Sequence, residues 1–102
     1  MAYCPPRMLE DISGVLVMVR TWPGVVERKP GIFYVNREPF LHFHRVAGGE
    51  RRADVKGRRG WSKIVLPIPL PAGARRTFVR TLTACYRERA VAVSPARAAR
   101  SS

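Results

Sequence analysis

The sequence predicts an α+β fold, a two-layer sandwich in which two helices pack on one face of an antiparallel sheet of four or five strands. Helical periodicity occurs near each end of the chain, and short β-branched and aromatic segments separated by turn residues lie between. A layered α–β–β–β–β–α order buries all of these apolar faces together. With 102 residues, the chain has the length of one domain. We expect residues 1–90 to form it, with a flexible tail over 91–102.

The first helix is expected over residues 6–20. Met8, Ile12, Val15 and Val19 recur at the spacing of one helical face. Pro6 suits the first helical position, where its missing N–H would have no partner in any case. The turn-forming residues 21–24 then end the helix.

Strands are expected at 31–35, 40–46, 52–56 and 62–68, with a short additional strand at 25–27. Turn residues separate these segments, at 36–39, at the Gly48-Gly49 pair and at 57–60. Pro67 and Pro69 imply that the last strand ends at a sheet edge or leaves the ladder.

The second helix is expected over residues 72–90. Its apolar stripe is typical of a helix packed on a core, while most of its arginines lie off the stripe. The stripe consists of Phe78, Val79, Leu82, Cys85 and Tyr86.

Alternation of apolar residues predicts the register of the hairpin over residues 40–56. The apolar residues of both arms face the helices together only if Phe43 lies opposite Ala53. The same register then brings polar residues together on the other face of the sheet, with His42 opposite Asp54 and His44 opposite Arg52.

Three of these polar residues are a candidate site. An imidazole beside a carboxylate has a raised pKa, which suits a general base, and two histidines two residues apart in a strand turn nitrogens to one side. Nearby arginines would oppose a cation, so no metal ligand and no catalytic residue is assigned. A small enzyme or metal site built on His42, His44 and Asp54 remains an alternative.

Charge favours a polyanionic partner. The formal net charge is +12, and between residues 51 and 63 six cations accompany a single acid. An aromatic ring among cations suits nucleic acid, since the cations contact phosphates and the ring stacks on a base. The predicted contacts are Arg51, Arg52, Lys56, Arg58, Arg59, Trp61 and Lys63, with arginines of the second helix as a secondary patch.

Two further classes stay open. The uncovered sheet face could hold a small ligand in a pocket lined by Tyr34, Phe40 and Trp61 together with the histidines and Asp54, or it could pair two subunits as a homodimer. No cofactor is expected, because the sequence has no phosphate-binding glycine loop and no nucleophile motif.

The sequence predicts a cytoplasmic protein without a membrane partner. Its two cysteines, Cys4 and Cys85, have neither metal-type nor paired spacing. The apolar run at residues 14–19 is far shorter than the about 20 residues of a membrane span.

A short motif adds a family resemblance. The segment at residues 22–27, Trp-Pro-Gly-Val-Val-Glu, follows the first expected helix, and with the element order it resembles the small bacterial MmcQ/YjbR-like proteins of frataxin-like topology. The resemblance implies the α+β fold and a suspected role in DNA binding. Frataxin iron chemistry needs an acidic first helix, and here that helix offers only Glu10 and Asp11.

Overall fold

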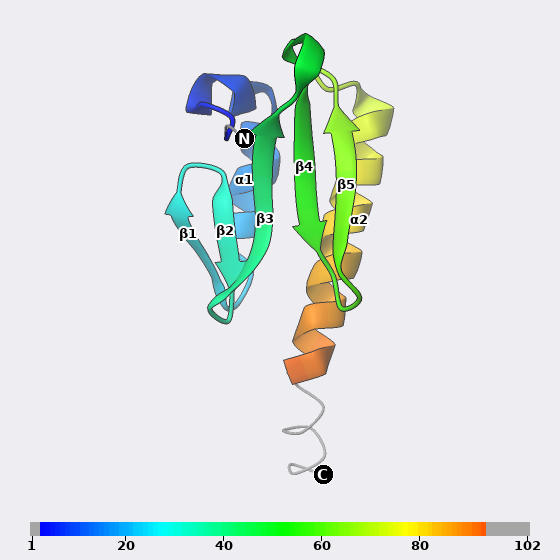
Figure 1. Ribbon diagram of the computed structural model, residues 1–102. Coiled ribbons are helices and arrows are strands. Elements are labelled where there is room, and N and C mark those ends of the chain that lie inside the picture. Colours follow the sequence, from blue (N-terminus) through cyan, green and yellow to red (C-terminus); the bar gives the residue numbers. More distant parts are fainter. Residues whose placement is uncertain (1–2, 94–102) are drawn as a thin grey trace.

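The computed structural model describes residues 3–93 and confirms the α+β prediction. Five antiparallel strands form one open sheet in the order β1-β2-β3-β4-β5, with the helices on one face (Figure 1). The elements are η1 (Pro6–Ile12), α1 (Ser13–Arg20), β1 (Val25–Lys29), β2 (Ile32–Val35), β3 (Glu38–Arg45), η2 (Ala47–Gly49), β4 (Arg51–Lys56), β5 (Trp61–Leu66) and α2 (Ala72–Val93).

The N-terminal helical region is divided, where the sequence predicts one helix over 6–20. Residues 6–12 form the 3₁₀ segment η1, and Ile12 leaves helical geometry at φ −115° and ψ 19° before α1 begins. Two carbonyl oxygens of η1 accept hydrogen bonds from arginine side chains, that of Met8 from Arg51 and that of Asp11 from Arg75. Carbonyl oxygens near a helix end lack partners within the helix, and side-chain donors can bind them there.

The hairpin register is the predicted one. Phe43 pairs with Ala53, His42 with Asp54 and His44 with Arg52. A second register feature was not predicted: a bulge between β2 and β3 lets two successive residues, Phe40 and Leu41, both face the helices and become fully buried.

This bulge corrects the expectation for Phe40. Its ring lies 6.5 Å from that of Trp22 and 6.2 Å from that of Tyr86, between centroids, so it packs in the helix-side core. It therefore does not line the uncovered face of the sheet.

The strand ends differ slightly from the sequence expectations. β1 extends to Lys29 rather than residue 27, and β5 ends at Leu66 instead of continuing to residue 68. Pro67 follows immediately, and because a proline has no N–H to donate, it ends the ladder there.

The core lies between the sheet and the two helices. Ile12 and Val15 from the N-terminal region and Phe78 and Leu82 from α2 are buried, as their stripes predict. α2 continues to Val93, three residues past its expected end, and the rest of the expected tail, 94–102, lies outside the described residues. Within residues 3–93, every helix is too short or too polar to cross a bilayer.

Candidate nucleic-acid interface and histidine cluster

Most of the predicted site residues lie on the sheet face opposite the helices. This face is called the outer face. Cross-strand partners share a face, so the pairs His42↔Asp54, Asp54↔Lys63 and Lys56↔Trp61 all lie on it. The outer face consists of Val26, Arg28, Tyr34, His42, His44, Arg52, Asp54, Lys56, Trp61, Lys63 and Val65, together with Tyr3 beside β3.

Trp61 is an aromatic platform on this face. The residue is 39% exposed, although its ring centroid lies only 4.6 Å from that of His42. The ammonium of Lys56 lies 5.8 Å from the ring centroid, within the range of a cation–π contact. The ring is therefore held by neighbours while part of its surface stays accessible to a ligand.

The turn between β4 and β5 carries two arginines, Arg58 and Arg59, directly before Trp61 in the sequence. The Gly57 N–H donates to the Gly60 carbonyl at 2.8 Å, and the Arg58 N–H donates to a Glu88 carboxylate oxygen at 2.9 Å. A Cβ at Gly57 would come within 2.7 Å of that carboxylate, so glycine permits the close approach of the turn to α2. Arg58 and Arg59 are exposed at the rim of the outer face.

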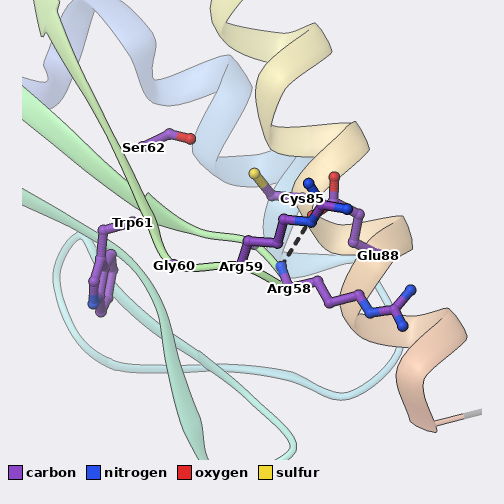
Figure 2. Close-up of a pocket in the computed structure, with 8 residues that line it drawn as sticks. Arg58, Arg59, Gly60, Trp61, Ser62, Cys85 and Glu88 are labelled. Atoms are coloured by element: carbon purple, nitrogen blue, oxygen red, sulfur yellow. Dashed lines mark hydrogen bonds between the residues drawn. The ribbon is translucent and has the colours of Figure 1, made fainter.

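An open pocket of about 520 Å³ lies behind this turn (Figure 2). Trp61 lies on one side of the turn in Figure 2, and the two arginine side chains extend on the other side toward α2. Burial raises the pKa of the Cys85 thiol in its wall, and the Glu88 charge raises it further. The thiol is thus protonated near neutral pH, which does not favour nucleophilic chemistry here.

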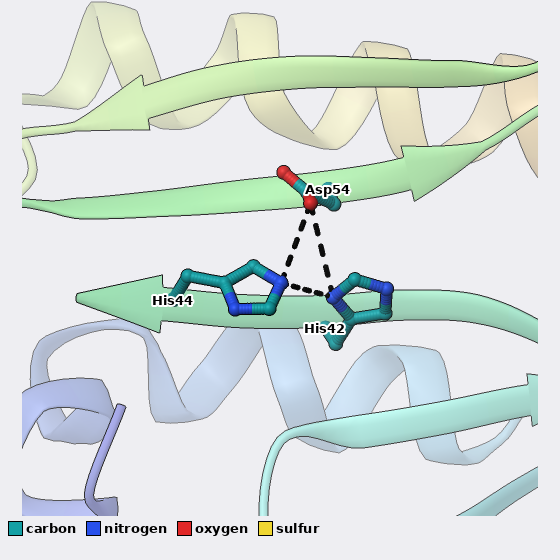
Figure 3. A group of neighbouring side chains, drawn as sticks. All are labelled: His42, His44 and Asp54. Carbon is teal, nitrogen blue, oxygen red and sulfur yellow. Dashed lines mark hydrogen bonds and ion pairs between the residues drawn. The ribbon is translucent and has the colours of Figure 1, made fainter. Parts of the chain in front are cut away.

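The histidine cluster is compact. His42 Nδ1 lies 2.7 Å from His44 Nε2, and Asp54 Oδ2 lies 3.3 Å from His44 Nε2 and 3.9 Å from His42 Nδ1 (Figure 3). Both imidazoles turn one nitrogen toward the same carboxylate oxygen. The other nitrogen of His44, Nδ1, is buried and has no hydrogen-bond partner within the described part of the chain.

The expectation that the pKa of His42 lies above its ordinary value is wrong. Burial lowers the pKa of His42, and the neighbouring His44 lowers it further, against the opposing effect of Asp54. Burial likewise lowers the pKa of His44, which is 7% exposed. The carboxylate is also shared with Arg52, whose Nε donates to Asp54 Oδ1 at 2.7 Å. Both imidazoles are therefore neutral at neutral pH.

Arg51 does not belong to the exposed basic surface. It faces the helices with 0% exposure and makes a bidentate ion pair with Asp11, with N–O distances of 2.5 and 2.7 Å. It also donates to the carbonyl oxygens of Met8 and Pro67. Its assignment to a nucleic-acid contact is therefore wrong, because it links η1 to the sheet from inside the protein.

The other predicted contacts fall into two groups. Arg52 is half-buried and paired with Asp54, so its charge is largely compensated. Arg58, Arg59 and Lys63 are exposed, and Lys56 is half-buried beside Trp61. These four cations and the tryptophan are the predicted residues that remain available to a polyanion.

Acidic residues are largely absent from this surface. In residues 3–93, Asp54 is the only acid at an outer-face strand position. Two other acids are engaged elsewhere, Asp11 with Arg51 and Glu27 with Arg20, while Glu88 lies beside the β4–β5 turn and accepts from the Arg58 N–H. The outer face and its rim therefore have a positive excess, although Asp54 lies within it.

Two outer-face residues were not predicted from the sequence. Tyr3 forms a β-bridge with His44 and stacks on its imidazole, with centroids 5.0 Å apart and an interplanar angle of 22°. Arg28 lies over the ring of Tyr34, 4.3 Å from its centroid. Tyr3 precedes every expected element, so no periodicity could place it, whereas alternation along β1 would have placed Arg28 opposite the core.

No family model matches this chain, and neither the curated proteins nor the solved structures contain a match to it.

Proposed function

We propose that this protein binds single-stranded nucleic acid on its outer face, with Trp61 stacking on a base. Lys56, Lys63, Arg58 and Arg59 are the proposed phosphate contacts. The observation that carries the proposal is the partly exposed tryptophan on a sheet face without helices, with Lys56 beside its ring and Lys63 on the same face. Stacking on an aromatic ring together with a basic path for the backbone is the usual chemistry of single-strand recognition.

Single strands suit this surface better than a duplex. Trp61 and the exposed Tyr3 offer ring faces, and a base can stack on a ring only when it has left its own helix. Duplex reading by a helix would instead require α2, whose exposed arginines Arg76 and Arg80 lie on the helix layer behind the sheet (Figure 1). A preference for duplex would therefore indicate that the helix layer, and not the outer face, binds nucleic acid.

The test is fluorescence anisotropy with a labelled single strand of about 12 nucleotides, long enough for a small domain. Trp61→Ala should weaken single-strand binding by about 1–3 kcal/mol, roughly 5- to 150-fold, and should weaken duplex binding less. Unchanged affinity would show that the ring does not stack.

Salt dependence tests the phosphate contacts. Binding to single strands loses affinity with a log–log slope of about −0.7 per neutralised phosphate. The double variant Arg58→Ala/Arg59→Ala should therefore reduce the magnitude of the slope by up to about 1.4. The control Arg76→Ala/Arg80→Ala removes the same charge from α2 and should change the slope much less. An equal effect of both double variants would mean that net charge, and not the proposed site, governs binding.

A second reading of the same face is a homodimer, favoured by the exposed apolar residues Val26 and Val65. Sedimentation across a range of protein concentrations separates the two readings. A concentration-independent monomer that binds single strands supports the proposal, whereas a stable dimer without nucleic-acid binding supports the alternative.

We also propose a bacterial, cytoplasmic protein of the MmcQ/YjbR-like type. Supporting this are the two buried free thiols, Cys4 and Cys85, and the turn at residues 22–27 between the first helix and the sheet. Thiol alkylation of the protein freshly released from its native cells tests the compartment: two reduced cysteines are expected, and a disulfide would contradict a reducing location.

A further inference from the structure

We propose that His42, His44 and Asp54 bind a divalent transition-metal ion, with Zn²⁺ as the best fit. This inference does not depend on nucleic-acid binding. It rests on the positions of three ligand atoms, His42 Nδ1, His44 Nε2 and Asp54 Oδ2, which lie within 4.8 Å of one another on adjacent strands.

The separations match metal–ligand distances. The three atoms are 2.7, 3.3 and 3.9 Å apart. A circle through atoms with these separations has a radius of about 2.0 Å, and Zn²⁺ bonds to histidine nitrogen at about 2.0–2.1 Å and to carboxylate oxygen at about 2.0–2.2 Å. An ion just out of the plane of this triangle would thus reach all three ligands at these distances.

At most one N–H proton competes with a metal ion for the two facing nitrogens. Each neutral imidazole has one N–H, and the two facing nitrogens are too close, at 2.7 Å, for both to carry it. At most one proton therefore lies between the two nitrogens, in a single N–H···N hydrogen bond, and Asp54 Oδ2 accepts a hydrogen bond from Arg52 Nη2 at 3.1 Å. A bound cation would take a lone pair from both nitrogens and from Oδ2, and each imidazole would then carry its N–H on its other ring nitrogen.

The surroundings hold the ligands in place. The guanidinium of Arg52 binds Asp54, mainly through Oδ1, and orients the carboxylate whose Oδ2 points to the histidines. Tyr3 stacks on His44, and Trp61 packs against His42. The positive charge of Arg52 opposes the ion, so we expect moderate rather than very tight affinity.

Three protein ligands leave a tetrahedral ion one further position. This count is characteristic of zinc sites that bind water or a substrate atom, whereas structural zinc sites use four protein ligands. Nitrogen and carboxylate donors without sulfur also suit Co²⁺, which provides a spectroscopic probe of the same site.

The experiment uses the tag-free, chelator-treated protein and titrates ZnCl₂ by calorimetry. We expect one ion per chain, and we expect Co²⁺ to give visible bands of a tetrahedral site without a thiolate charge-transfer band. Asp54→Asn and His42→Gln should each weaken Zn²⁺ binding at least about 10-fold, while the control Cys85→Ser should leave it unchanged. Loss of binding in Cys85→Ser would place the ion elsewhere and overturn the proposal.

A measurement on the unsubstituted protein does not depend on whether the variants fold. The chain has only two histidines, so every imidazole signal in a ¹⁵N NMR spectrum comes from the proposed site. Zn²⁺ should shift the signals of His42 Nδ1 and His44 Nε2 most. Histidine signals that do not move at excess Zn²⁺, or binding with no defined stoichiometry, would refute the site. Oligonucleotide binding measured on the same metal-free sample is a separate result, so each proposal can fail alone.

Discussion

Replacing Arg51 with methionine should destabilise the protein severely while leaving the outer face intact. The guanidinium is fully buried and contacts the Asp11 carboxylate at 2.5 and 2.7 Å as well as the carbonyl oxygens of Met8 and Pro67. Methionine fills similar space but satisfies none of these acceptors. The Asp11 carboxylate then stays in a partly buried position with only the Leu70 N–H and its remaining solvent exposure to stabilise it.

Removing one partner of a buried ion pair costs about 3–5 kcal/mol. Because Asp11 keeps its bond from Leu70, we expect a loss of about 3 kcal/mol. The free energy of unfolding of a domain of this size is about 5–15 kcal/mol, so the loss is a large fraction of its stability. Urea denaturation followed by circular dichroism measures it, and a melting temperature lower by about 12–24 °C is the thermal equivalent.

The matched control is Arg59→Met, which makes the same chemical change at an exposed position and should alter stability by less than about 0.5 kcal/mol. Adding Asp11→Leu to Arg51→Met removes the uncompensated charge and should recover part of the loss. An Arg51→Met protein as stable as Arg59→Met would refute the buried ion pair.

Three further predictions concern stability. Leu82→Ala should cost about 2–5 kcal/mol in urea denaturation, because Leu82 is fully buried beneath the sheet, and a loss under 1 kcal/mol would place it outside the core. Arg51 holds the pKa of Asp11 below its ordinary value, so the stability that this ion pair contributes is fully present above the unfolded pKa of about 4 and is lost as the pH falls through the folded pKa. In acid, the free energy of unfolding of Asp11→Asn should therefore fall less steeply with pH than that of the unchanged protein, and equal slopes would contradict this. Gly31→Ala should lower the free energy of unfolding by more than about 1 kcal/mol, because φ is +78° and the new methyl would come within 2.6 Å of a Leu9 methyl. Gly48→Ala, at φ +83° but with open space around it, should lower it less. Equal losses would mean that only backbone strain matters.

The sequence was sufficient for the parts of the site that depend on alternation. In the β3–β4 hairpin, a shift of one residue would turn the apolar residues of one strand away from the core, so burial excludes that register, and the turn at Gly48-Gly49 selects the pairing of His42 with Asp54. The two helices on one face follow from the same requirement, since both apolar stripes need the same side of the sheet.

Other features depend on long-range contacts that local patterns do not contain. Arg51 shares the strand parity of Ala53 and Val55, so alternation places it on the helix face, but no local pattern contains its ion pair with Asp11, 40 residues earlier. The direction of the His42 pKa shift depends on how deeply Trp61 and the neighbouring residues cover the ring. Phe40 turned inward because of a bulge, which alternation cannot anticipate.

The most direct test of the proposed function monitors Trp61 itself. The chain has two tryptophans, so Trp22→Phe leaves Trp61 as the only one, in a protein whose outer face is unchanged. Its emission is followed at low salt while a single-stranded oligonucleotide is added, with label anisotropy measured in parallel. The account predicts saturable quenching of Trp61 that parallels the anisotropy and disappears as salt is raised, since stacking and phosphate contacts occur together. Binding without any change in Trp61 emission, or no binding at about 50 mM salt, would contradict it.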